Sequence, residues 1–140
     1  MSASSPVVVY DGLCAFCDAG IRWLLRRDRG AVLRFATRGS AAADACIAAV
    51  GADPAAQPAS VLLVHEGRVW AHSDAVIECL ALLGGPWRAV RAVRVVPRAL
   101  RDAVYGFTAA RRRAVFGTLD ACRVPSPAER ARFLDADERR

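Results

Sequence analysis

A short apolar run ends in a turn that brings two cysteines to the start of a helical pattern. Val7–Tyr10 is a β-type run, Asp11-Gly12 is a typical turn pair, and Cys14 and Cys17 follow at once, separated by two residues. The first backbone N–H groups of a helix have no internal partner and carry partial positive charge, which stabilises a thiolate placed there. Two cysteines at this spacing can also close a disulfide across one helical turn. The segment is therefore suited to thiol–disulfide exchange.

The same cysteine spacing is half of a zinc site, so a metal-binding module is an alternative. Such a module would need further ligands, and Cys14, Cys17 and Cys122 form its candidate set. No second close pair supports it, since His65 and His72 are spaced more widely than paired histidine ligands usually are. We therefore favour a redox pair, with no bound metal and no dissociable cofactor.

Strand and helix patterns alternate through the first part of the chain. A strand–helix–strand unit at its start implies parallel strands joined by a right-handed crossover. Glu66-Gly67 predicts an antiparallel hairpin farther on. The fold class is therefore α/β. The expected elements are a strand over 7–10, a helix over 14–27, a strand over 33–37, a helix over 40–50, strands over 60–65 and 68–71, and a helix capped by Ser73 or Asp74 and ending at 83.

From Trp87 onward the pattern is helical and lacks the alternation of strands. We expect Pro97 and Gly106 to interrupt these helices. Ser126-Pro127-Ala128-Glu129 has the capping serine, first-turn proline and third-position glutamate of a helix start. The sequence therefore predicts a helical C-terminal extension.

Length and composition limit the possible partners and the number of domains. With 140 residues, 54% of them apolar, the chain can bury one core, so we expect a single domain over 1–140: a core over about 6–85 with the extension, about 86–140, packed on it. All 20 basic residues are arginines and the net charge is +6, but they are scattered, so no nucleic-acid partner is expected. No apolar run reaches the roughly 20 residues of a membrane span, and no signal-peptide pattern is visible, which predicts a cytoplasmic protein.

The motif Tyr10-Asp11-Gly12-x-Cys14-x-x-Cys17 resembles the signature of the DCC family, which comprises predicted thiol–disulfide oxidoreductases with a thioredoxin-like core. The resemblance runs from about 7 to 133. It implies a β-α-β-α-β-β-α core with a helical extension, and a cysteine pair that is itself the redox group. The other matching segments are 60–64, Glu66-Gly67, 73–75, Val96-Pro97, Arg101-Asp102, Tyr105, Arg112, Phe116-Gly117 and Cys122.

Four residues around the turn are candidates for the chemistry. Cys14 is the expected nucleophile, with the more exposed sulfur, and Cys17 is expected to resolve the mixed disulfide formed on it. Asp11 has two interpretations, a proton relay for Cys17 or an acceptor for N–H groups of the turn, and we favour the second. Gly12 is expected to adopt a positive φ or to allow close approach of the substrate.

Four further residues are expected to support the site. Phe16 offers an apolar contact to a polypeptide substrate, and Ser60 offers a hydroxyl or a backbone bond on the substrate side. Arg112 belongs to an arginine triplet that resembles a solvated face, and its flanking residues depart from the Asn and Tyr of the family pattern. We expect the extension to bring Arg112 and Cys122 near the cysteine pair. Cys122 then either takes part in the redox chemistry or is a buried packing residue.

The sequence leaves the substrate open between a protein and a small-molecule thiol or disulfide, and it leaves the recycling reductant open. Pro58 lies near the position where thioredoxin-like proteins usually have a cis-proline, but the match is loose, and we treat it as an ordinary loop proline. A thioredoxin-like interaction module without catalytic activity is the third interpretation.

Overall fold

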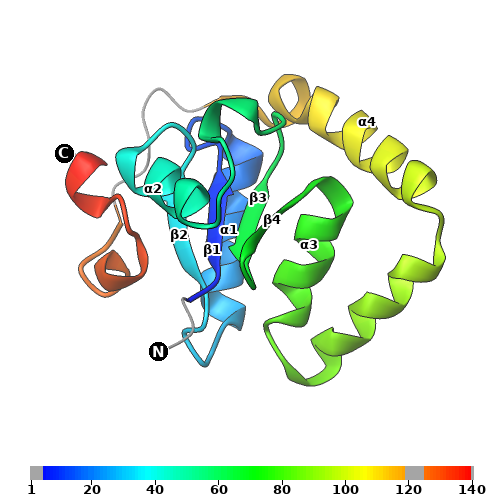
Figure 1. Cartoon of the computed structure of the whole chain (residues 1–140), viewed down its shortest axis with the longest axis horizontal. Coiled ribbons are helices and arrows are strands. Elements are labelled where there is room, and N and C mark those ends of the chain that lie inside the picture. The colour runs from blue at the N-terminus through cyan, green and yellow to red at the C-terminus, as the bar shows by residue number, and fades with distance from the viewer. Residues whose placement is uncertain (1–4, 119–124, 140) are drawn as a thin grey trace.

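A four-stranded mixed sheet forms the centre of the computed structural model, which describes residues 5–118 and 125–139 (Figure 1). The strands are β1 (Val7–Tyr10), β2 (Arg34–Thr37), β3 (Leu62–His65) and β4 (Arg68–Ala71). Their order in the sheet is β2-β1-β3-β4. β1 runs parallel to β2 and antiparallel to β3, and β3 and β4 form the expected hairpin.

Helices cover both faces of this sheet. The helices are α1 (Ala15–Arg27), α2 (Ala41–Ala49), α3 (His72–Ala81) and α4 (Arg98–Phe116), with 3₁₀ segments η1 (Pro54–Ala56), η2 (Gly85–Val95), η3 (Arg130–Arg132) and η4 (Ala136–Arg139). α2 lies in front of the sheet in Figure 1, α1 lies behind it, and α4 packs against α1 and α3. The order β1-α1-β2-α2-β3-β4-α3 confirms the predicted thioredoxin-like α/β fold.

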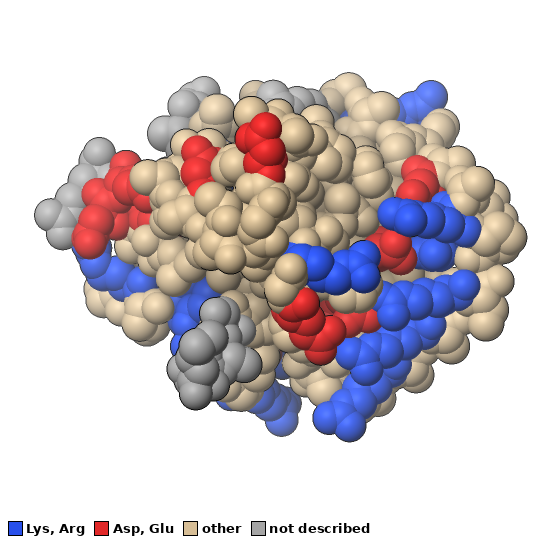
Figure 2. Space-filling view, in the orientation of Figure 1, with Lys and Arg blue, Asp and Glu red and all other residues tan. Residues whose placement is uncertain are grey.

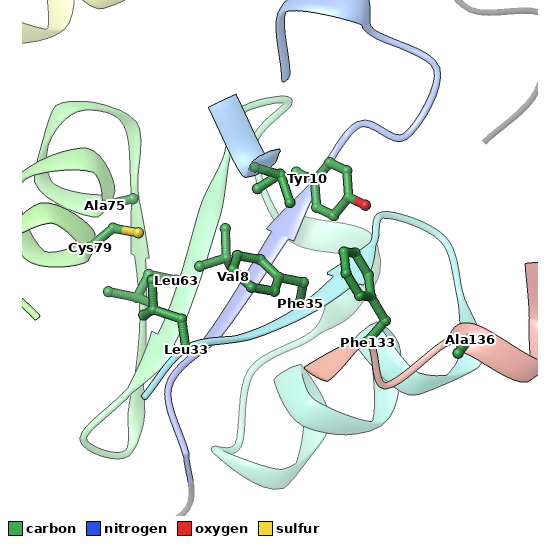
Figure 3. Close-up of a cluster of buried hydrophobic side chains, with 10 residues drawn as sticks. Val8, Tyr10, Leu33, Phe35, Leu63, Ala75, Cys79, Phe133 and Ala136 are labelled. Carbon is green, nitrogen blue, oxygen red and sulfur yellow. The ribbon is translucent and has the colours of Figure 1, made fainter. Parts of the chain in front are cut away.

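Two apolar clusters, one on each face of the sheet, hold these layers together. Successive side chains of a strand point to opposite faces. Val8 and Tyr10 therefore join the cluster under α1 and α3, and Val7 and Val9 join the cluster under α2. The first cluster also contains Phe133, which comes from the C-terminal end of the described chain (Figure 3).

The C-terminal residues complete the core beside β2. The ring of Phe133 is buried 5.4 Å from the ring of Phe35, and Asp135 accepts a hydrogen bond from the Thr37 N–H at 3.0 Å. Glu138 accepts hydrogen bonds from the first N–H groups of α2. Figure 1 shows this segment next to β2 and α2, away from α4.

The helix start expected at 126–129 is only partly formed. The Ser126 N–H donates to the Glu129 carboxylate at 3.2 Å, as a capping box requires. The chain then forms the short 3₁₀ segment η3 in place of an α-helix, because burial of Phe133 against the core ends the helical path.

Two other helix predictions are corrected by tertiary contacts. Gly106 does not interrupt a helix but lies inside α4. α3 begins at His72, and no side chain caps it. The Ser73 hydroxyl and N–H instead donate to Asp102 on α4, and the hydroxyl bond holds the pKa of Asp102 below its usual range. The Ser73 side chain thus bonds to the Asp102 carboxylate, 29 residues away, and does not cap α3.

Arginine and acidic side chains are interleaved along the side of the molecule formed by α3, η2 and the start of α4 (Figure 2). Arg94 contacts Glu78 at 2.5 Å, and Arg101 and Arg98 contact Asp74 at 2.9 Å and 3.5 Å. These pairs attach η2 and α4 to α3 and neutralise part of the positive charge. In the part of the chain that the structure describes, no helix is long and apolar enough to cross a membrane.

Candidate active site

The turn after β1 places Cys14 at the N-cap of α1. Asp11 Oδ1 accepts a hydrogen bond from the Leu13 N–H at 3.0 Å, and the Asp11 carbonyl oxygen accepts one from the Cys14 N–H at 3.3 Å. Cys14 has extended backbone angles, φ −90° and ψ 117°, and its carbonyl accepts the first helical hydrogen bond from Asp18 at 2.9 Å. The Asp11 carboxylate thus shapes the turn that presents the cysteine pair.

The two thiols have unequal environments. Cys14 Sγ accepts a hydrogen bond from the Cys17 N–H at 3.4 Å. Burial and the hydrogen bond between the Cys17 thiol and Cys14 raise the pKa of Cys17 to about 12, although the positive charge of Arg112 acts in the opposite direction. Cys17 is therefore the thiol that keeps its proton, and the Cys14 sulfur accepts a hydrogen bond from the Cys17 thiol.

Cys14 is the more buried of the two, so the expected exposure of its sulfur is wrong. The exposed fraction of Cys14 is 0%, whereas Cys17 is half-buried. Thr118, just beyond the end of α4, forms an antiparallel β-bridge with Cys14. The ring of Phe116 packs 4.8 Å from the ring of Phe16. The end of α4 therefore covers the outer side of the cysteine pair.

Arg112 makes a third contact between α4 and the turn. Its Nη2 lies 3.8 Å from Asp11 Oδ2, and the two side chains are 16% and 21% exposed. Arg112 is thus not part of a solvated face, unlike Arg111, which is exposed and packs over the Phe107 ring at 3.9 Å. We refer to residues 112–118 as the cover segment.

We expect the cover segment to limit the rate at which Cys14 reacts. Phe116→Ala removes one aromatic pair, worth about 0.5–1.5 kcal/mol. The fraction of molecules in which the cover segment is displaced from Cys14 is therefore expected to rise about two- to tenfold. The rate of Cys14 alkylation by iodoacetamide, followed on the Cys14 peptide by mass spectrometry, should rise by the same factor. Phe107→Ala, which removes an exposed aromatic ring from the same helix, is the control. Equal rates in the two variants would mean that the cover segment does not limit access.

The structure describes three other residues that the sequence singled out around the site. Ser60 is buried, and its hydroxyl is engaged within the fold, donating to the Val61 carbonyl at 2.9 Å and accepting from the His72 N–H at 3.2 Å. Gly12 is buried in the turn, and the expectation that it adopts a positive φ or allows close approach of the substrate stays a prediction. No peptide bond in the described residues is cis, so Pro58 is an ordinary loop proline.

Tyr105 and Thr118 are contacts that the sequence analysis did not assign to the site. The Tyr105 hydroxyl accepts a hydrogen bond from the Val61 N–H at 3.0 Å, just before β3. Its place among the residues that resemble the family was the available signal. The sequence holds no such signal for Thr118, because Thr118 pairs with Cys14 through a backbone bridge, which any side chain allows.

The remaining cysteines lie apart from this arrangement or outside the described residues. Burial raises the pKa of Cys46 and raises that of Cys79 to about 12. Cys122, the third ligand of the metal-binding alternative, lies outside the described residues. Within 5–118 and 125–139, no three His, Cys, Asp or Glu side chains are grouped so as to hold a metal ion.

A thioredoxin-like sheet whose first helix begins with a C-x-x-C pair defines the general class of this protein. Residues 8–118 match the model of the DCC1-like thiol-disulfide oxidoreductase family, and the chain belongs to that family. This confirms the resemblance seen in the sequence.

Two relatives are similar over most of the chain. One is "Uncharacterized protein YuxK" of Bacillus subtilis (strain 168), 31% identical over 128 residues, covering 91% of this chain and 93% of the relative. The other is "DCC family protein At1g52590, chloroplastic" of Arabidopsis thaliana, 29% identical over 118 residues, covering 84% of this chain and 68% of the relative. No solved structure gives a significant match to the chain.

Proposed function

We propose that the protein is an enzyme that catalyses thiol–disulfide exchange through Cys14 and Cys17. The unequal environment of the two thiols is the observation that carries this proposal. Cys17 is held protonated, whereas Cys14 accepts two hydrogen bonds at the start of α1, where a thiolate is stabilised. Membership of the DCC1-like family supports the same chemistry.

Cys14 is the proposed nucleophile and Cys17 the resolving thiol. The Cys14 thiolate attacks one sulfur of a substrate disulfide, and the other sulfur leaves as a thiolate. Cys17 then loses its proton and attacks the Cys14 sulfur, which closes the internal disulfide and releases the second half of the substrate. The positive charge of Arg112 lowers the pKa of Cys17 and so favours this deprotonation. Asp11 acts as a positioning residue, through the turn and through Arg112.

Trapping of the mixed disulfide tests these roles. Reduced Cys17→Ser protein, treated with bis(2-hydroxyethyl) disulfide, is expected to keep one hydroxyethylthio adduct on Cys14, because the proposed resolving thiol is removed. Peptide mass spectrometry locates the adduct. The Cys14→Ser/Cys17→Ser double variant measures reaction at Cys46, the other half-buried cysteine among the described residues. If both proteins carry the adduct only on Cys46, the assignment of Cys14 as nucleophile is wrong.

The proposal also includes partners and a compartment. A separate reductant would return the Cys14–Cys17 disulfide to the dithiol, and the cytoplasm supplies such reductants. We propose no nucleic-acid partner, because arginines beside α3 are engaged with acidic side chains. Cell fractionation, with alkylation of the thiols at lysis, tests the compartment and the resting redox state together.

A further inference from the structure

An apolar cavity of about 350 Å³ lies between α1, α3, α4 and the sheet, beside the cysteine pair. Phe16 and Cys17 border it at the start of α1, and Val8, Leu63 and Leu80 line its interior. This volume lies in the range of small-molecule sites, which are mostly apolar with a few polar groups. The aliphatic or aromatic body of a small molecule fits such a space, whereas a folded polypeptide does not.

Few polar groups line the cavity, and the two largest are engaged within the fold. Arg112 and Tyr105 both line it, but the Arg112 guanidinium faces Asp11 and the Tyr105 hydroxyl is bonded to the Val61 N–H. A ligand would therefore meet apolar surface over most of its length and the thiol of Cys17 at one end.

The cavity also reaches the sulfur pair at Cys17. On the outer side, Thr118 of the cover segment forms a β-bridge with Cys14, which is completely buried and does not line the cavity. On the inner side, Cys17 borders the cavity, and its N–H lies 3.4 Å from Cys14 Sγ. A disulfide that lies against Cys17 is thus next to the residue whose N–H contacts Cys14 Sγ.

We infer that the substrate is a small disulfide with a largely apolar body, which binds in this cavity and presents its S–S bond to Cys14. The inference rests on the proposed function. Cys14 forms a bond to one substrate sulfur, and the substrate S–S bond breaks. Cys17 then gives up its proton and bonds to Cys14. The protein loses two electrons, and the substrate disulfide becomes two thiols. The two leaving thiolates take up the Cys17 proton and one proton from water. A dithiol reductant such as dithiothreitol then restores the pair.

Gly20 gives a way to block the cavity without straining the fold. It lies on α1 and lines the cavity, and a Cβ atom added there meets nothing within 4 Å. A larger residue also favours the helix more than glycine does. Gly20→Leu therefore fills space that a ligand would use. Ala19→Leu, at the next position on α1, is exposed and does not line the cavity, so it is the matched control.

The test compares neutral disulfides that differ only in alkyl length: bis(2-hydroxyethyl), bis(4-hydroxybutyl) and bis(6-hydroxyhexyl) disulfide. Alkylation quenching and mass spectrometry measure how fast each one oxidises the reduced protein. The second-order rate constant is expected to rise about tenfold or more along the series, because each added methylene is buried on binding. Gly20→Leu should remove most of this gain. Ala19→Leu should behave like the unaltered protein.

The outcomes separate this inference from the proposed function. A flat series, or a gain that survives in Gly20→Leu, overturns the cavity as the substrate site, while oxidation that requires Cys14 still supports the enzyme. A disulfide-bonded peptide that reacts faster than every alkyl compound overturns the inference in favour of a polypeptide that displaces the cover segment. Absence of Cys14-dependent oxidation by any of these compounds contradicts the proposed function itself.

Discussion

Replacing Cys14 with serine is expected to lower the steady-state rate of thiol–disulfide exchange on the order of 10³-fold or more, because a serine hydroxyl does not form the mixed disulfide. Cys17→Ser, mixed with bis(2-hydroxyethyl) disulfide in the absence of dithiothreitol, should show a single burst of mixed-disulfide formation on Cys14. The measurement is oxidation of dithiothreitol by bis(2-hydroxyethyl) disulfide, with and without each variant. The background reaction of the two reagents is subtracted.

The matched control for this loss is Cys46→Ser. Cys46 is also a half-buried free cysteine, but it lies on α2, on the opposite face of the sheet from α1. Cys46→Ser should retain the full rate. If Cys14→Ser is folded by circular dichroism and keeps its activity while Cys46→Ser loses it, the pair at the start of α1 is not the redox centre.

The features that the sequence predicted well are those specified by neighbouring residues. The continuous apolar run of β1 and the Glu66-Gly67 turn specify the sheet locally. Glu66 and Gly67 adopt the positive φ values, 53° and 74°, of a tight hairpin. Ser40 caps α2 through the Ala43 N–H, as its position indicated. In each case the deciding contact lies within a few residues.

The features that it missed depend on partners far along the chain. The N-terminal cysteine of the pair is fully buried, and it forms a β-bridge with Thr118, which lies 104 residues farther along the chain. The arginine triplet reads locally as a charged face, yet Arg112 turns inward to Asp11, because α4 crosses the turn there. No local pattern contains this information, since it depends on how α4 is placed by its contacts with α1 and α3.

The largest stability effect is expected at Asp28, which joins α1, β2 and the C-terminal segment. Asp28 is 4% exposed at the C-cap of α1. Its carboxylate accepts hydrogen bonds from the Val32 N–H at 3.1 Å and the Leu33 N–H at 2.8 Å, and from the Arg132 guanidinium. Asp28→Ala leaves these donors without their acceptor and a half-buried cation without its partner. The free energy of unfolding is expected to fall by about 3–5 kcal/mol, measured by urea denaturation.

Asp137→Ala is the control for this prediction, because it removes an ion pair of the same C-terminal segment at the surface. Asp137 contacts Arg130 at 2.7 Å, but its side chain is 86% exposed, so its removal should cost less than about 1 kcal/mol. Arg132→Ala, combined with Asp28→Ala, measures the coupling between the Arg132 guanidinium and the Asp28 carboxylate. Equal small losses for Asp28→Ala and Asp137→Ala would mean that the C-terminal segment contributes little to the fold. Folded Asp28→Ala should still exchange disulfides at the normal rate, because Asp28 lies at the end of α1 opposite to the cysteine pair.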